Sequence, residues 1–88
     1  MEHTAELTFP LSFAMKIIMQ AESREGENRS RLVSVFEGLA VRHANWSEKA
    51  SGAGRYVSYS VLVTAENREE FLLVHEKIAK VPGVRYVL

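Results

Sequence analysis

Residues 51–65 read SGAGRYVSYSVLVTA, a glycine-containing run that leads into a long alternating segment. Side chains of a β-strand point alternately to its two faces, so residues 55–65 predict a strand with one bulky face and one mixed face. The bulky set is Val57, Tyr59, Val61 and Val63, and the mixed set is Tyr56, Ser58, Ser60, Leu62 and Thr64. We expect the bulky face to lie against the core and the mixed face to be open.

The glycine run itself could turn the chain or bind a phosphate. A phosphate loop presents backbone N–H groups at the start of a helix, and the P-loop adds a lysine followed by serine or threonine. SGAGRY runs into a strand instead, and no lysine follows it. Glycines between two strands favour a hairpin turn, so we expect residues 51–56 to join a short strand, NWSEKAS at 45–51, to the long one.

A second alternating segment, SFAMKIIMQ at residues 12–20, predicts the first strand. Its two faces follow from the alternation. One face carries Phe13, Met15, Ile17 and Met19, and the other carries Ala14, Lys16, Ile18 and Gln20. The residues before it, 1–10, are expected to form a flexible tail that ends at Pro10.

Two helices and a closing strand are predicted around these strands. Residues 22–31, ESREGENRSR, lack large apolar side chains and predict a solvated loop. Apolar residues at three- and four-residue spacing predict a helix over 31–43, in which Gly38 costs about 1 kcal/mol relative to alanine. A second helix begins at an Asn67 cap with Glu70 three residues later, and Pro82 and Gly83 end it. VRYVL at 84–88 supplies the last strand.

The order of elements is therefore strand, helix, strand, strand, helix, strand. This order predicts an α+β, ferredoxin-like βαββαβ sandwich, in which two helices cover one face of a four-stranded antiparallel sheet. We expect a single domain over residues 11–88, with the other face of the sheet uncovered.

Composition restricts the classes of function. The 88 residues contain no cysteine, and 11 Lys and Arg balance 11 acidic residues, all of them glutamate. Disulfides, thiolate metal sites and aspartate-built calcium loops are excluded. The zero net charge gives no overall attraction for nucleic acid or a membrane, and we expect neither as a partner. The acidic start, MEHTAELTFP, and the short apolar runs predict a cytoplasmic protein.

No set of residues predicts catalysis, a metal or a cofactor. His3, His43 and His75 lack H-x-x-x-H spacing, and Glu69 and Glu70 are adjacent and diverge around their helix. A small enzyme of this fold, with chemistry near the 22–31 loop and His43, stays open as an alternative. RNA binding is less favoured, because the nearby Tyr56 and Tyr59 lie on opposite strand faces and cannot stack bases together.

The open sheet face and the hairpin are the candidate interaction surface. A face that mixes apolar and small polar side chains can contact water alone, or can bind another copy, a partner protein or a small-molecule effector. Its predicted residues are Lys16, Ile18, Arg55, Tyr56, Ser58, Ser60 and Leu62.

Several short motifs resemble one family. They are FP at 9–10, KIIMQA at 16–21, RHA at 42–44, the glycine turn with YVSYSVLVTA, and the final VRYVL. In this order they resemble the YbeD-like family of small bacterial proteins of unknown function. The resemblance implies an ACT-like fold, a regulatory and non-catalytic role, and a homo-dimer or other homo-oligomer.

The chain departs from this family in two places. The family commonly has SSKGNY where this chain has SGAGRY, so Ala53 stands in place of a lysine and Arg55 in place of an asparagine. The loop after the first strand, where ACT domains often bind amino acids, is also several residues longer here. A role for that lysine, or for an ACT-type ligand site, does not carry over from the resemblance.

Overall fold

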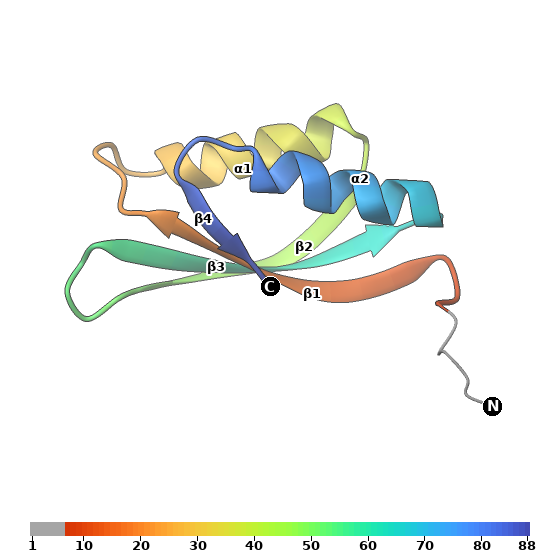
Figure 1. Cartoon of the computed structure of the whole chain (residues 1–88), viewed down its shortest axis with the longest axis horizontal. Helices are drawn as coiled ribbons and strands as arrows, with labels where there is room; N and C mark the ends of the chain where they lie inside the picture. The colour runs from red at the N-terminus through yellow and green to blue at the C-terminus, as the bar shows by residue number, and fades with distance from the viewer. Residues whose placement is uncertain (1–6) are drawn as a thin grey trace.

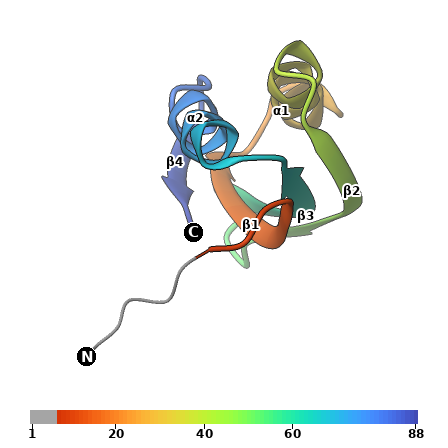
Figure 2. The same cartoon turned by 90° about the vertical axis from the view of Figure 1, so that its right-hand side faces the viewer.

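The computed structural model describes residues 7–88 and has the expected order of elements. The sheet is antiparallel with strand order β2-β3-β1-β4, and both helices lie on one side of it (Figures 1 and 2). The ferredoxin-like βαββαβ fold is confirmed. The elements are β1 (Leu11–Gln20), α1 (Glu27–Gly38), β2 (Arg42–Ala50), β3 (Tyr56–Ala65), α2 (Arg68–Ala79) and β4 (Val84–Val87).

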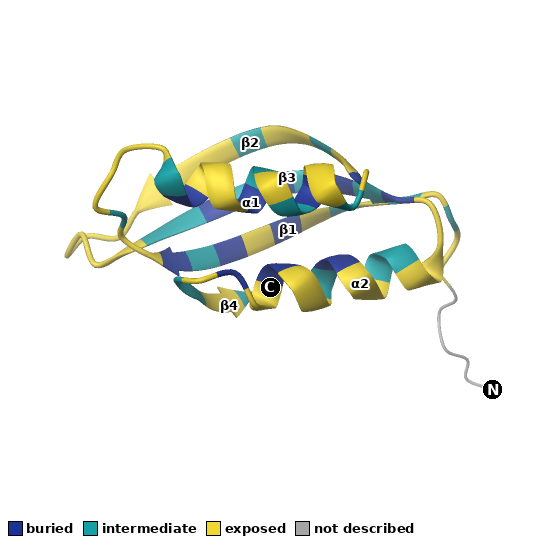
Figure 3. Cartoon of the chain, turned by 90° about the horizontal axis from the view of Figure 1, so that it is seen from above, coloured by how far each residue is buried: buried dark blue, intermediate teal, exposed yellow. Residues whose placement is uncertain are grey.

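The two central strands, β1 and β3, pair along their whole length, from Leu11 opposite Ala65 to Gln20 opposite Tyr56. Their predicted faces are confirmed, because the bulky positions of both strands lie under the helices (Figure 3). Burial of one face fixes this register, since a slip of one residue would expose every core side chain. The buried core includes Met15, Ile17, Met19, Leu32, Phe36, Tyr59, Val61, Val63, Val74 and Ile78.

The start of α1 differs from the sequence prediction. Residues 27–31 were expected in a loop but form the first turns of the helix. The Glu22 carboxylate accepts hydrogen bonds from the backbone N–H groups of Gly26 (2.9 Å) and Asn28 (2.8 Å). The buried Asn28 side chain donates to the Gln20 carbonyl at 2.8 Å. These polar contacts anchor a helix start that has no apolar periodicity.

The end of α1 also differs, since the helix stops at Gly38 and His43 belongs to β2. Ala40 takes a left-handed conformation with φ of 57°. The N–H groups of Ala40 and Val41 donate to the carbonyls of Glu37 (3.1 Å) and Phe36 (2.9 Å), the pattern of a Schellman motif. The prediction of a helix to residue 43 was therefore wrong, and the chain reverses into β2 at Ala40.

Ala40 gives a testable prediction about this reversal. A left-handed conformation costs an L-residue about 1–2 kcal/mol, and glycine adopts it without that penalty. We expect Ala40→Gly to raise the free energy of unfolding by about 0.5–1 kcal/mol, since the more flexible unfolded chain offsets part of the gain. Urea denaturation followed by circular dichroism measures the change. A loss of stability would contradict the left-handed assignment.

The second half of the chain follows the prediction. The Asn67 side chain accepts from the Glu70 N–H at 2.8 Å, and the Glu70 carboxylate accepts from the Glu66 N–H at 2.7 Å. In the hairpin between β2 and β3, the Ser51 N–H donates to the Tyr56 carbonyl at 2.8 Å, and Gly54 has φ of 73°. SGAGRY is confirmed as a turn.

Residues 1–6 of the predicted flexible tail lie outside the described residues. In the remainder of that segment, the Phe9 ring lies 6.4 Å from the ring of Phe71 in α2, and Phe71 in turn contacts Phe13 at 5.0 Å. Neither helix of residues 7–88 combines the length and the apolar character that crossing a membrane requires.

Candidate functional site

The strand pairings define which side chains stand together on the open face of the sheet, the face without helices. Residues directly opposite each other on paired strands point to the same face. Two neighbouring rows cross the sheet from β2 to β4. The first is Lys49, Ser58, Ile18 and Tyr86, and the second is Ser47, Ser60, Lys16 and Leu88.

A shallow pocket of about 290 Å³ lies on this open face beside the hairpin. Lys16 and Ile18 of β1 line it together with Tyr56 and Ser58 of β3. Its remaining lining is Lys49, Ala50, Ser51 and Gly52. The structure thus brings four of the seven predicted surface residues together around one pocket.

The other three predicted residues lie outside this pocket. Ser60 stands between Lys16 and Ser47 in the second row. Arg55 lies in the hairpin, where its carbonyl accepts from the Ala21 N–H at 2.8 Å. Leu62 lines a different pocket, further along β3.

Four residues of these two rows are not among the predicted ones: Ser47, Lys49, Tyr86 and Leu88. Tyr86 and Leu88 are 65% and 69% exposed, although both are large and apolar. Both edge strands contain a bulge that shifts the alternation. Asn45 and Trp46 together face the single residue Val61, and Arg85 is an extra residue in β4. Unless the positions of these bulges are known, the alternation of the sequence does not show which edge-strand residues lie on the open face.

The open face is positively charged although the chain has no net charge. Within residues 7–88, neither Lys16 nor Lys49 lies within ion-pair distance of a carboxylate. Glu48 of β2 stands opposite Tyr59 and so points to the helix side. Glu66 binds Arg42 at 2.8 Å at the far end of the sheet. The two lysines are therefore available to an external anion.

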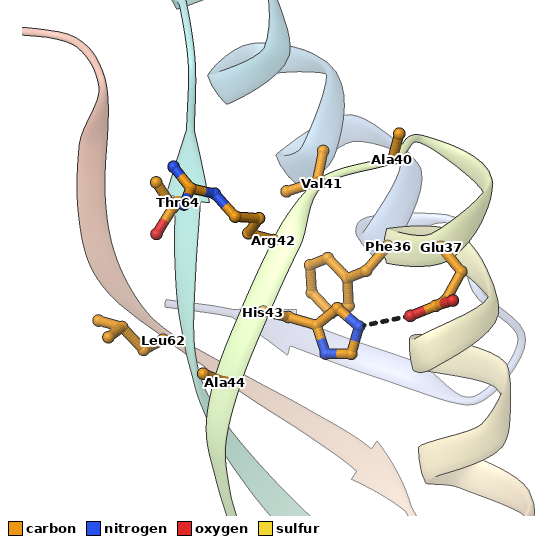
Figure 4. Close-up of a pocket in the computed structure, with 9 residues that line it drawn as sticks. All are labelled: Phe36, Glu37, Ala40, Val41, Arg42, His43, Ala44, Leu62 and Thr64. Atoms are coloured by element: carbon orange, nitrogen blue, oxygen red, sulfur yellow. Dashed lines mark hydrogen bonds and ion pairs between the residues drawn. The ribbon is translucent and has the colours of Figure 1, made fainter.

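A larger pocket, of about 560 Å³, surrounds the first residues of β2 (Figure 4). Phe36 and His43 lie on the helix side of the strand, whereas Ala44, Leu62 and Thr64 lie on the open side (Figure 4). The lining residues therefore do not converge on one point. This pocket follows the free edge of the sheet and does not form an enclosed cavity.

His43 uses both ring nitrogens within this region. The Trp46 Nε1–H donates to His43 Nδ1 at 2.9 Å, and His43 Nε2 lies 3.0 Å from a Glu37 carboxylate oxygen. Because Nδ1 accepts, Nε2 carries the proton and donates to Glu37. The ring also stacks on Phe36 at 5.3 Å, and the Arg29 guanidinium lies 5.1 Å from the Trp46 ring centre. His43 joins α1 to β2 and has no ring nitrogen free for a substrate.

The remaining titratable groups also make structural contacts. His75 Nδ1 lies 2.8 Å from the Phe71 carbonyl, and its ring stacks on Phe13 at 5.3 Å. Burial raises the pKa of the Tyr59 phenol, and a hydrogen bond with Asn28 opposes this rise. His3 lies outside the described residues. Across the described part of the chain, no three His, Cys, Asp or Glu side chains are grouped so that they could hold a metal ion.

A third pocket, of about 310 Å³, lies at the N-terminus of α1. Its lining includes Glu22, Asn28 and Arg31. Helix N-termini attract anions, but here the chain's own Glu22 carboxylate already binds the N–H groups of Gly26 and Asn28. The anion position in the loop after β1 is thus filled from within the chain.

Comparison with solved structures supports the fold. A Helicobacter pylori protein with a solution structure matches with a TM-score of 0.76 and 16% identity, over 97% of this chain and 88% of that one. The ACT domain from GTP pyrophosphokinase of Chlorobium tepidum matches with a TM-score of 0.67 and 14% identity, over 88% and 94% of the two chains. These likenesses confirm the ACT-like architecture.

Comparison of sequences gives the family. A UPF0250 protein of Shewanella piezotolerans is 33% identical over 82 residues, and one of Pasteurella multocida is 31% identical over 86 residues. Each alignment covers 93% of this chain and 90% of the relative. Residues 4–88 match the family described as a protein of unknown function, DUF493. The YbeD-like resemblance is confirmed, and the chain belongs to the DUF493 family.

Proposed function

We propose that this chain is a small, non-catalytic regulatory or adaptor protein that works by binding through the open face of its ACT-like sheet. The observation that carries the proposal is the open-face pocket, where Ile18 and Tyr56 lie beside two lysines without a carboxylate partner. Exposed apolar side chains next to polar groups are typical of interaction sites. Tyr86 and Leu88 extend this apolar surface toward β4.

The arrangement of the helices supports the same function. Both helices cover the opposite side of the sheet, so a partner can reach the open face without any rearrangement of the core (Figure 2). The engaged nitrogens of His43 argue against the alternative of an enzyme that uses this histidine as a base. We therefore place the activity in recognition, of a partner protein or a small effector, and not in chemistry.

A charged substitution in the centre of the face tests the proposal. We expect Ile18→Arg to reduce the amount of bound partner at least tenfold in affinity capture from a bacterial extract, because it places a cation in the apolar part of the pocket. Leu72→Arg, on the exposed outer side of α2, serves as the matched control and should keep the partner. Equal capture by both variants, with unchanged circular dichroism, would remove the open face from the proposal.

Self-association is a second part of the proposal. Among residues 7–88 no strand lies beside the outer edge of β2, Arg42–Ala50, and unpaired edges can join copies into a larger sheet. We expect light scattering at high micromolar concentration to give about twice the 9.9 kDa mass of one chain. A mass of one chain at all concentrations would contradict this part alone and leave the open-face proposal standing.

A further inference from the structure

We infer that the open face binds an extended acidic segment of a partner protein, with carboxylates that meet Lys16 and Lys49 on either side of an apolar side chain that contacts Ile18. This inference rests on the proposed function and specifies the chemistry of the partner. It follows from the position of the charges, the spacing of the two lysines, and the character of the surface between them.

The charge of the face selects an anionic partner. Lys16 and Lys49 are exposed, lie outside every ion pair of the described residues, and line the same pocket on the open face. The described glutamates lie in loops, on the helices, or on the helix side of β2. An acidic segment would thus meet two cations and none of the described glutamate side chains near the pocket.

The spacing of the two lysines selects an extended segment. Lys49 and Ile18 are separated by Ser58, so they lie two strand spacings apart, about 10 Å. Lys16 is two residues from Ile18 along β1, about 7 Å. The two lysine Cα atoms are therefore about 12 Å apart by this strand geometry. In an extended chain, residues i and i+4 lie about 13 Å apart and on the same side as residue i+2. The pattern acidic-x-apolar-x-acidic spans the two cations. Its middle residue lies over Ser58 and Ser60, about 6 Å from Ile18 by the same strand geometry, so a large apolar side chain there can contact Ile18.

A second copy of this chain fits the face less well. Two copies packed by their open faces would bring Lys16 and Lys49 of one against the same cations of the other, with none of the described glutamates between them. This favours the strand edge for self-association and reserves the face for another protein.

Single-stranded nucleic acid also carries anions, but the aromatic side chains are poorly placed for it. Tyr56 lies on β3 and Tyr86 on β4, with β1 and Ile18 between them. Successive bases stack on neighbouring aromatic rings, and an aliphatic side chain here interrupts that platform.

The experiment measures fluorescence anisotropy of a labelled peptide with the sequence E-S-L-S-E, capped at both ends. We expect the double variant Lys16→Glu and Lys49→Glu to bind at least tenfold more weakly than the wild type, and added salt to weaken wild-type binding. The wild-type protein should bind the uncharged peptide Q-S-L-S-Q more weakly than E-S-L-S-E by a similar factor. Arg68→Glu is the control: it makes the same change of charge per site at the first residue of α2, where an acidic residue also suits the helix dipole. Its affinity for the peptide should stay within about twofold of the wild-type affinity.

Several outcomes would overturn the inference. These are equal binding of the E and Q peptides, equal weakening by Arg68→Glu, or no saturable binding of the acidic peptide at about millimolar protein. Tighter binding of an oligouridine of matched charge would assign the face to nucleic acid instead. Both lysines are exposed, so thermal melting should show that the double variant folds like the wild type.

The two proposals fail separately. If Ile18→Arg loses the captured partner but the double lysine variant keeps it, the open face is a binding face and its acidic preference is wrong. If both variants keep the partner, the proposed function itself is wrong.

Discussion

Replacing Phe36 with alanine is expected to lower the free energy of unfolding by about 3–5 kcal/mol, the range measured for large buried aromatic residues. Phe36 is fully buried on α1. Its ring stacks on His43 at 5.3 Å and meets the edge of Trp46 at 5.8 Å. The variant would leave a cavity where α1 packs on β2, in addition to the lost burial of the ring.

A loss of this size would be a large share of the whole free energy of unfolding of a chain of 88 residues. Domains of this length are stable by roughly 5–13 kcal/mol. Urea denaturation followed by far-ultraviolet circular dichroism measures the change. Tryptophan fluorescence is less suitable, because the fluorescence of Trp46 would itself respond to the loss of its neighbour Phe36. Leu72→Ala, at an exposed position of α2, is the control and should change stability by less than about 0.5 kcal/mol. A cost below about 1 kcal/mol for Phe36→Ala would contradict its place in the core.

The central strands were predictable because one face of each is buried. Burial of alternate residues leaves a period of two in the sequence, and β1 and β3 show it over their whole length. The same alternation placed Lys16, Ile18, Tyr56 and Ser58 on the open face. This half of the candidate site could therefore be read from the sequence.

The edge strands were harder to read because each contains a bulge. Asn45, with φ of 56°, and Arg85 each shift the alternation by one residue. Lys49 and Tyr86 reach the open face only because of these shifts. Nothing in the local composition requires a bulge, since its position depends on the neighbouring strand.

The ends of α1 were mispredicted for different reasons. Its start is held by Glu22, which precedes the helix and contacts it through space, so a search for apolar periodicity does not find it. At its end, Ala40 and His43 continue the three- and four-residue spacing of the helix, but His43 belongs to the alternation of β2. Two periodicities overlap in this segment, and the left-handed Ala40 decides between them.

The net charge of the chain does not describe the charge of its open face. A total of zero is correct for the chain, but the fold places the described glutamates away from the pocket and leaves Lys16 and Lys49 on it. The electrostatic field that a partner meets depends on this separation, not on the sum.

The buried Asn28 gives the second large effect. Asn28 is 3% exposed, and its side chain donates to the Gln20 carbonyl at the end of β1 at 2.8 Å. Burial raises the pKa of the Tyr59 phenol on β3, and the Asn28 side chain opposes this rise, so the two groups also interact. Alanine would leave the Gln20 carbonyl without this contact in a region that water reaches poorly. We expect Asn28→Ala to lower the free energy of unfolding by about 2–3 kcal/mol. Ser30→Ala, at an exposed position of the same helix, should cost less than about 0.5 kcal/mol.

A double-mutant cycle separates the contribution of Tyr59 from that of Gln20. Tyr59→Phe removes only the phenol hydroxyl, so if the hydroxyl and Asn28 stabilise each other, the double variant should lose less than the sum of the two single losses, by about 0.5–1 kcal/mol. Additive losses would mean that Asn28 acts through the Gln20 carbonyl alone. In that case its role is to attach the start of α1 to the end of β1, beside the open-face pocket that begins two residues earlier at Ile18. A cost near zero for Asn28→Ala would show that this side chain does not hold α1 in place.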